Sequence, residues 1–338
     1  MATTMKAWQA ASPGPFDKTL KLRDDLPRPS QKLQDGQILV QVIRAGLNPA
    51  DFKMCEIGLA SRAITSFPKT PGMDLSGRIV DVAEGVTDVK NGDLVIARAT
   101  PTKAGGSLSE FVVVDREGYA TLPDGFDLDQ AAGAPTAALT AYQTIGPHIK
   151  AGDKVFINGG SGGVGQFGIQ VAKALGCHVT VTCSTAKADL CKSLGADDVI
   201  DYKTSDVLTE LKKDGQVFSL CVDNVGDSPP NLYARAHDFL LPGSKFVFVG
   251  GHVSRSSFIS LASSLFRPAF LGGGKHKFIN YITANKASDL EQLRDWLVDG
   301  KLRTVIDSTF GFEEAGEALE RLKKGASGGK IIVRVQEK

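Results

Sequence analysis

Cysteine and histidine are scarce, and neither is spaced to bind a metal. The 338 residues include five cysteines, an odd number with no C-x-x-C pair, and five histidines without metal-ligand spacing. A structural zinc site needs four converging ligands, and a disulfide framework needs paired cysteines. The pattern therefore indicates reduced thiols in a cytoplasmic compartment, with no bound metal. Cys183 and Cys221 lie in strand-like runs and are expected to be small buried residues.

Excess charge of one sign and long apolar runs are absent as well. The formal net charge is +1, which gives no reason to expect a nucleic acid partner. No apolar run approaches the length of a membrane span, and residues 1–14 lack the apolar core of a signal peptide. The composition, 42% hydrophobic and 23% charged, is ordinary for a globular protein, and the length suggests two domains.

Glycine, by contrast, is concentrated in one stretch, residues 154–175. Five glycines fall between positions 159 and 165, after the apolar run Val155–Ile157 and before apolar residues at helical spacing. The order is strand, tight turn and helix, and the turn contains G-x-G-x-x-G at positions 160, 162 and 165. In this setting the backbone can approach a pyrophosphate, whose charge is favoured by the helix start. The stretch predicts a dinucleotide-binding site, and a merely tight structural turn is the alternative.

The pattern of strands and helices changes near residue 127. Before that point, short alternating runs are separated by Pro, Gly, Asn and Asp, which predicts an antiparallel β barrel or sandwich. From there to residue 284, candidate strands and helices alternate, which predicts a parallel sheet covered on both faces. One of these helices is expected over residues 229–243. Two further helices, within 288–300 and 312–325, and a strand at 330–335 are expected in the tail.

The order of these motifs resembles that of the medium-chain dehydrogenase/reductase superfamily. The matching pieces are the N-terminal β region, AAGAPTAALTAYQTI, NGGSGGVG, LGADDVIDY and the C-terminal GGKIIV, which together span nearly the whole chain. The resemblance is strongest to the zinc-free quinone oxidoreductase and alkenal/enone reductase branch. It implies an α/β fold with a GroES-like β-barrel catalytic domain, residues 1–129 completed by 285–338. A Rossmann-type doubly wound parallel sheet domain that binds NADPH would occupy residues 130–284.

Zinc dehydrogenases of this superfamily bind a catalytic zinc through Cys, His and Cys, and the matching places here hold other residues. Asn48 stands at the first thiolate position, and Met73 and Asp74 stand at the His-Glu position. Without a Lewis acid to polarise an alcohol, oxidation of simple alcohols is disfavoured. Reduction of an already activated C=C bond fits these residues better.

The choice of nicotinamide cofactor is indicated by the end of the second strand of the nucleotide-binding domain. A chain that selects NAD usually has Asp or Glu about 20 residues after the glycines. Residues 182–187 contain no acid, and Asp189 is the first carboxylate. By resemblance to quinone reductases, Ser184, Lys187 and Tyr202 match residues that bind the 2′-phosphate of NADPH. The alternatives are a solvated lysine at a helix start and a core or rim aromatic.

Further site residues follow from family positions. Asn48 would contact cofactor or substrate, and Lys53 would bind a ribose hydroxyl or stabilise a developing enolate oxygen. Asp51 is expected to cap a helix instead. The other residues expected to contact the cofactor lie in the glycine loop, after later strands and in the last strand: Gly160, Ser161, Gly162, Gly163, Val164, Asn224, Val249, Gly250, Gly251 and Lys330. For Gly251 a structural turn is an equal alternative.

The implied reaction is direct hydride transfer from NADPH to a small apolar enone, enal or quinone, without a compelling general acid. The alternatives are a trans-acting enoyl reductase of a polyketide pathway and a non-catalytic NADPH-binding protein. A monomer or homodimer is expected. Residues 252–277 combine apolar side chains with six basic ones. They are interpreted as a wall of the substrate pocket, a dimer contact or a membrane-surface element.

Overall fold

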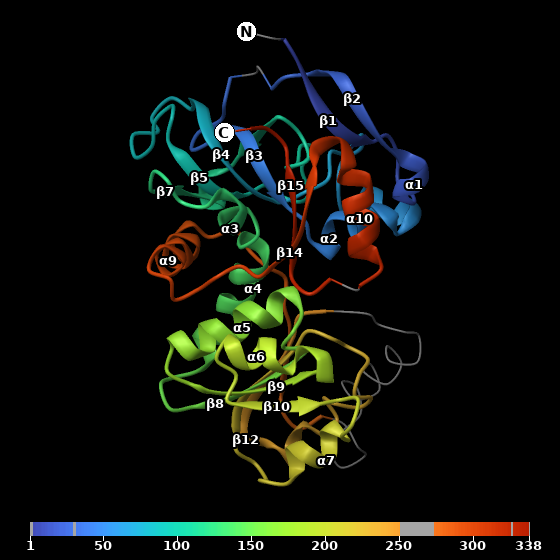
Figure 1. Cartoon of the computed structure of the whole chain (residues 1–338), viewed down its shortest axis with the longest axis vertical. Helices are drawn as coiled ribbons and strands as arrows, with labels where there is room; N and C mark the ends of the chain where they lie inside the picture. Colours follow the sequence, from blue (N-terminus) through green and yellow to red (C-terminus); the bar gives the residue numbers. More distant parts are fainter. Residues whose placement is uncertain (1–2, 30–31, 251–273, 326, 338) are drawn as a thin grey trace. The chain divides into compact units, whose positions relative to one another are not determined.

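The structure is a computed structural model that describes residues 3–29, 32–250, 274–325 and 327–337. It divides into two compact units, Met1–Leu139 with Asn285–Lys338, and Thr140–Ala284 (Figure 1). The sequence predicts this boundary at 129/130. The observed division falls later because α3 (Leu128–Ala132) packs on strands of the first unit. The interpretations of Gly251 and of most of the 252–277 segment lie outside the described residues.

The first unit is built on a mainly antiparallel seven-stranded sheet. At its centre, β3 (Ile38–Gly46) pairs with three other strands and is buried at all but one residue, which explains its nearly continuous apolar sequence. A ribbon of β1 (Thr4–Ala10) and β2 (Leu20–Pro27) lies in the same unit. The sheet order is β14 (Ile306–Gly311), β15 (Lys330–Arg334), β3, β4 (Asp74–Val82), β5 (Leu94–Arg98) and β7 (Tyr119–Leu122), with β6 (Phe111–Val114) also paired to β3.

The longer helices of the first unit each bury one apolar face. In α10 (Ala315–Lys323) Glu317, Glu320 and Arg321 are exposed, and the buried residues recur at helical spacing. Three leucines do the same in α9 (Ala287–Val298). The shorter helices are α1 (Phe16–Thr19) and α2 (Pro49–Glu56), and α2 has proline at its first position, where no N–H is needed.

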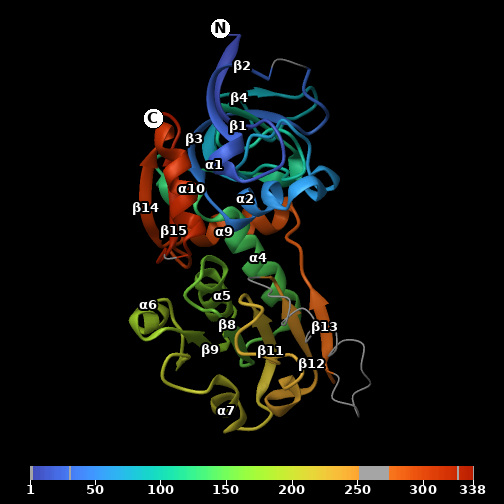
Figure 2. The ribbon, with the colours of Figure 1, turned by 90° about the vertical axis from the view of Figure 1, so that its right-hand side faces the viewer.

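The second unit contains a six-stranded parallel sheet, whose strands lie side by side in Figure 2. Chain order reverses between β8 and β11, the switch point at which ligands bind in such sheets. This confirms the Rossmann-type fold that the alternating pattern predicts. In sheet order the strands are β10 (Asp198–Asp201), β9 (His178–Cys183), β8 (Lys154–Asn158), β11 (Phe218–Asp223), β12 (Leu240–Phe248) and β13 (Lys277–Asn280).

The helices around this sheet are mostly those that the sequence predicts. Of these, α5 (Gly163–Ala174) follows the glycine loop. Pro135 begins α4 (Pro135–Ile145), and the division between the two units falls within this helix. The shorter α6 (Ala188–Ser193) lies within an expected helix, whereas α7 (Val207–Lys212) is not predicted by the sequence.

The helix expected over residues 229–243 is wrong. This segment consists of turns, the short helix η5 (Ala236–Asp238) and the start of β12. Two prolines open it, and Asn231 has a φ of 62°, which interrupts a right-handed helix. Its apolar residues pack in the core of the second unit from turns instead.

All five cysteines are buried and free, and Cys183 and Cys221 are the two whose burial the sequence predicts. Within the described residues, no helix has the length and apolar character that crossing a membrane requires.

Candidate functional site

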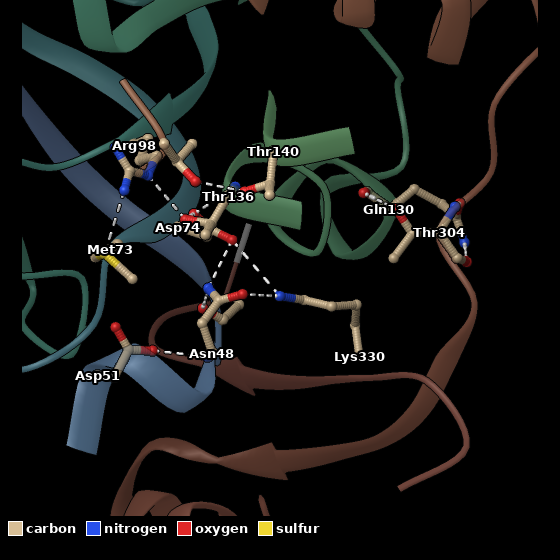
Figure 3. A network of polar contacts seen from close by, with 12 residues as sticks. Asn48, Asp51, Met73, Asp74, Arg98, Gln130, Thr136, Thr140, Thr304 and Lys330 are labelled. Carbon is tan, nitrogen blue, oxygen red and sulfur yellow. Dashed lines mark hydrogen bonds and ion pairs between the residues drawn. The ribbon is translucent and has the colours of Figure 1, made fainter. Parts of the chain in front are cut away.

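Buried polar side chains gather in the first unit, at the positions where the resemblance places the catalytic edge (Figure 3). We call Asn48, Asp51, Asp74, Thr136 and Lys330 the polar cluster. They come from the starts of α2, β4, α4 and β15. Except for Thr136, each is at most 5% exposed. Their polar atoms therefore depend on partners within the protein.

Asn48 is held at both ends of its side-chain amide. Its Nδ2 donates to Asp74 Oδ2 over 2.8 Å, and its Oδ1 accepts from Lys330 Nζ over 2.5 Å. Lys330 Nζ also lies 3.6 Å from Asp74 Oδ2 and forms a buried ion pair with it. Burial lowers the pKa of Lys330, and the carboxylates of Asp74 and Asp51 oppose that shift. The Asn48 amide is thus oriented by a cation on one side and a carboxylate on the other.

The second oxygen of Asp74 is fixed by the start of α4. Asp74 Oδ1 accepts from the backbone N–H of Thr136 over 2.9 Å and from its hydroxyl over 2.6 Å. N–H groups at a helix start lack helical partners, and the helix dipole favours a negative charge there. Arg98 Nε donates to the same hydroxyl over 2.9 Å, and Arg98 Nη1 donates to Asn285 over 2.6 Å. The carboxylate therefore has little freedom to move.

Asp51 is a second member of the cluster whose titration is altered. Its Oδ2 accepts from the Asn48 N–H over 2.7 Å, which is the helix-capping contact that the sequence predicts. Its Oδ1 is buried and has no hydrogen-bond partner among the described residues. Burial raises the pKa of Asp51 to about 7, with the Asn48 N–H acting in the opposite direction. The carboxyl group is consequently half neutral near pH 7.

Asp51→Asn is expected to change how stability depends on pH. Because the folded pKa is raised to about 7, the folded protein keeps a proton that the unfolded chain releases, and wild-type stability falls as pH rises toward that value. The contribution is at most about 1.4 kcal/mol per pH unit. The unfolding free energy of the variant minus that of wild type should rise between about pH 5 and 7 and then level off. Denaturant unfolding across this range measures it.

The control is Asp206→Asn, at the exposed start of α7. Its stability difference should stay constant over the same range, because the pKa of Asp206 is lowered from its ordinary value by bonds to Thr209. A pH-independent difference for Asp51→Asn would contradict the assignment.

The polar cluster does not fit a zinc ion. Positions 48, 73 and 74 supply an amide, a thioether and one carboxylate, whereas a zinc site needs three or four ligands, mainly thiolate and imidazole with at most a carboxylate or two. The Met73 sulfur contacts Arg98 Nη2 at 3.7 Å, and the Lys330 ammonium already lies against Asn48 and Asp74. A second cation would be repelled. Across the part of the chain that the structure describes, no group of three or more His, Cys, Asp or Glu is placed to hold a metal.

In the second unit, the glycine-rich loop between β8 and α5 is held at its base by β9. The Gly159 N–H donates to Thr182 Oγ1 and the Gly160 N–H to Thr182 O, each over 2.8 Å. Ser161 and Gly162 form the turn, and Gly163 and Val164 open α5. N–H groups in the first turn of a helix have no helical acceptors, so they are available to bind an anion.

The three glycines of the fingerprint differ in what a side chain would meet. A Cβ on Gly165 would lie 2.1 Å from Gly159 O, and a Cβ on Gly160 would lie 2.6 Å from Val181. A Cβ on Gly162 would meet only Gly159 O, at 3.5 Å, and Gly162 has an ordinary φ of −76°. The fold itself does not require glycine at 162, whereas close approach of a pyrophosphate would. The loop therefore fits a dinucleotide.

The segments after β11 and β12 are the other places where cofactor contacts are expected. Asn224 Nδ2 donates to Asn158 O over 3.2 Å, whereas the buried Asn224 Oδ1 has no partner among the described residues. A nicotinamide cofactor carries hydroxyl and amide donors that would satisfy this acceptor. Val249 and Gly250 directly follow β12 and are half-buried; the Val249 N–H donates to Asp223 O at the end of β11 over 2.9 Å.

The three residues expected to bind a 2′-phosphate lie together at the end of β9. The Lys187 N–H donates to Ser184 O over 2.8 Å, and the Tyr202 N–H donates to the carbonyl just before Ser184 over 3.2 Å. Tyr202 is 47% exposed, which excludes the interpretation of a core aromatic. The neighbouring Asp201 is engaged by a threonine hydroxyl and by the Lys203 N–H.

The remaining predicted site residues differ in their exposure. Lys53 is exposed on α2, whereas Asn48 and Lys330 are buried and in contact. The prediction from sequence gives Asp74 no site role beyond that of a departure from a zinc ligand. It also omits three polar residues at the carboxyl ends of apolar parallel strands, where ligands bind in such sheets: Asn158, Thr182 and Asp223.

The fold and these two sites define a dehydrogenase/reductase with a GroES-like catalytic unit and a dinucleotide-binding unit. Family models agree: residues 34–124 match the alcohol dehydrogenase GroES-like domain, and residues 194–333 match the zinc-binding dehydrogenase family. The chain belongs to the medium-chain dehydrogenase/reductase superfamily, whose members are oxidoreductases with a nicotinamide cofactor.

Similarity to individual proteins indicates the branch of the superfamily to which the chain belongs. The trans-enoyl reductase pgmF of Aspergillus terreus is 44% identical over 350 residues, covering 99% of this chain and 97% of the relative. The mitochondrial NAD(P)H oxidoreductase RTN4IP1 of Danio rerio is 34% identical over 330 residues, covering 89% and 84%. A solved quinone oxidoreductase from Coxiella burnetii has a TM-score of 0.82 and 29% identity, covering 98% of this chain and 100% of its own. These similarities confirm the quinone oxidoreductase and enoyl reductase branch.

Proposed function

We propose that this oxidoreductase reduces an activated C=C bond with NADPH as the hydride donor. The polar cluster is the observation that carries the proposal. The Lys330 ammonium binds Asn48 and Asp74 at the place where a metal-dependent relative needs metal ligands. Such a cluster offers no ligand set for a Lewis acid, which simple alcohol oxidation would require. A C=C bond conjugated to a carbonyl is polarised already and accepts hydride directly.

The residues of this chain would bind and orient the reactants. The cofactor, when bound, supplies the hydride. Asn48 offers an amide whose orientation Lys330 and Asp74 fix, so a reactant that contacts it meets a preorganised group. Lys53 is the candidate to stabilise negative charge on the substrate carbonyl oxygen. The glycine loop and the segments after β11 and β12 would hold the cofactor.

We favour an enoyl thioester as substrate, because the similar pgmF protein is named a trans-enoyl reductase. A free enone or enal fits the same chemistry. A quinone is the second candidate, and similarity to the Coxiella burnetii quinone oxidoreductase supports it. We also propose a cytoplasmic location on the basis of the five buried free thiols.

The protein is proposed to be a monomer or a homodimer, and light scattering would distinguish the two by their molecular mass.

The test follows NADPH consumption with three substrates: an enoyl chain attached to a carrier protein, the matching free enone, and a quinone. Turnover of the carrier-bound chain alone selects the trans-acting enoyl reductase. Turnover of the free enone or of the quinone selects the corresponding small-molecule reductase. Tight NADPH binding without turnover of any of the three would contradict the proposal and indicate a non-catalytic binding protein.

Lys187→Ala is expected to weaken NADPH binding by about tenfold or more and to leave NADH binding unchanged. Removing a cation from a phosphate site loses a charge-assisted hydrogen bond, which is worth about 1.5–3 kcal/mol. Titration of nicotinamide fluorescence measures both affinities. Lys192→Ala, which removes an exposed lysine from α6, is the matched control and should change neither. Equal affinities for NADPH in wild type and the Lys187 variant would refute the 2′-phosphate assignment.

A further inference from the structure

Three buried polar side chains lie beneath the glycine-rich loop. Asn158 ends β8, Thr182 is near the end of β9, and Asp223 ends β11. These strands are neighbours in the sheet, and Asn158 and Asp223 lie directly opposite each other. Each side chain is at most 3% exposed. Burying three polar groups side by side is unfavourable unless they are bonded to one another or to the loops above them.

The first part of the network holds the start of the glycine loop. Thr182 Oγ1 donates to Asn158 Oδ1 over 2.6 Å and accepts from the Gly159 N–H over 2.8 Å. Asn158 Nδ2 donates to Asp223 Oδ1 over 2.8 Å. The hydroxyl thus connects the glycine loop to Asn158, and Asn158 connects it to the carboxylate on the neighbouring strand.

The second part holds the segment after β11. Besides Asn158, Asp223 Oδ1 accepts from the Val225 N–H over 3.0 Å and from the Gly226 N–H over 3.1 Å. Gly226 has a φ of 91°, a conformation that glycine adopts and other residues resist. Asn158 Nδ2 also donates to Ser228 O over 2.7 Å. One carboxylate oxygen therefore fixes a turn that starts next to Asn224, the residue with the unsatisfied buried oxygen.

We propose that Asp223 is a positioning residue for the nicotinamide half of the cofactor. Through Asn158 and Thr182, it fixes the position of residues 224–226 relative to the glycine loop. The glycine loop would bind the pyrophosphate and residues 224–226 the nicotinamide ribose, so the distance between the two binding segments is set before the cofactor arrives. The proposal rests on the placement of the cofactor in the proposed function. It assigns no contact between Asp223 and the cofactor, because the side chain is buried beneath both loops. Preorganised loops bind more tightly because less freedom is lost on binding.

The proposal predicts that a substitution at Asp223 changes the affinity for one ligand and not for another. NADPH occupies both halves of the site, whereas adenosine 2′,5′-bisphosphate carries only the adenine half and its phosphates. Asp223→Leu removes the acceptor for three N–H groups and should weaken NADPH binding by about tenfold or more. The same variant should bind the bisphosphate within about twofold of wild type, because that ligand does not reach residues 224–226. Calorimetric titration measures both affinities without any need for turnover.

Two further variants distinguish a positioning role of Asp223 from a general loss of structure in the second unit. Asp223→Asn keeps an acceptor oxygen and should recover most of the NADPH affinity. Thr180→Val removes a buried hydroxyl from β9, the strand that contains Thr182. This hydroxyl bonds Asp198 and no cofactor loop, so the variant should change neither affinity. If Asp223→Leu does not fold, Asp223→Ser is measured instead, since its shorter side chain cannot reach all three donors.

A parallel loss of both ligands in the Leu or Ser variant would overturn the proposal, because it indicates a structural role only. Unchanged affinity for both ligands would overturn it as well. Failure of the NADPH assignment is recognised separately: wild type would then bind NADH and AMP in preference to NADPH and the bisphosphate. The comparison would in that case be made with NADH and AMP, and Asp223→Leu should weaken NADH alone.

Discussion

Gly162→Ala is expected to fold as well as wild type and to bind the cofactor at least about tenfold more weakly. A methyl group at this position has room in the protein, because its nearest neighbour would be Gly159 O at 3.5 Å, and the backbone φ of −76° suits alanine. The same methyl group would stand between the helix N–H groups and a pyrophosphate. A displacement of that phosphate by a fraction of an ångström weakens several hydrogen bonds to charge at once.

Gly165→Ala is expected to differ from Gly162→Ala in its effect on stability. A Cβ at 165 would lie 2.1 Å from Gly159 O, so the loop must rearrange and both stability and binding should fall. Gly105→Ala, in the first unit, has its nearest neighbour at 3.8 Å and should change neither. Thermal unfolding and cofactor titration of the three variants provide the test. A Gly162 variant with wild-type affinity would show that no pyrophosphate lies over this turn.

Lys330→Met is expected to be the most destabilising of the single substitutions considered. It removes the only ion-pair partner of the Asp74 carboxylate among the described residues, while leaving that group fully buried. Breaking a buried ion pair on one side costs about 3–5 kcal/mol, because the remaining charge has no compensation. The denaturation midpoint should fall accordingly, and turnover should fall with it, since Asn48 loses the donor that orients its amide.

A double variant tests whether the uncompensated charge is the cause. Lys330→Met combined with Asp74→Asn removes both charges of the buried ion pair, and the Asn48 amide can turn to accept from the new side chain. It should be more stable than Lys330→Met alone. Lys301→Met, which breaks an exposed pair with Asp299 at 3.4 Å, should change stability by about 0.5 kcal/mol or less. A Lys330 variant no less stable than this control would refute the buried ion pair.

The nucleotide-binding unit could be predicted from sequence because its signals are local. A strand, a glycine turn and a helix lie within 154–175, and the turn needs particular residues at particular positions. Elements without a strong local period were missed. The sequence IDSTFG of β14 has little apolar alternation and is mostly half-exposed, and α7 has only six residues. Residues 229–243 have helical spacing of apolar residues, yet the backbone at Asn231 prevents the helix.

The polar cluster could be predicted only in its parts. Asn48 and Lys330 were each indicated by family position, but they lie 282 residues apart and nothing local shows that they bond to each other. That contact depends on strand pairing, in which Ile332 lies opposite Gly46 and brings the start of β15 beside the start of α2. Asp74 looked like a zinc ligand that had been lost. Its role as an internal counter-ion depends on Lys330, which only the assembled sheet brings near.

The pairing of β15 with β3 also has a consequence for how the chain is made. The ribosome releases the residues of β3 and β4 early, whereas Lys330 leaves it after the whole second unit has emerged. Residues 140–284 are contiguous and contain every strand of their own sheet, so that unit can fold during synthesis. The first unit cannot be completed until β15 is synthesised, and until then the Asp74 carboxylate lacks the Lys330 ammonium as its ion-pair partner. Completion of the catalytic unit is therefore coupled to synthesis of the chain through residue 330, and a product truncated before that residue would carry a finished nucleotide-binding fold on an unfinished partner.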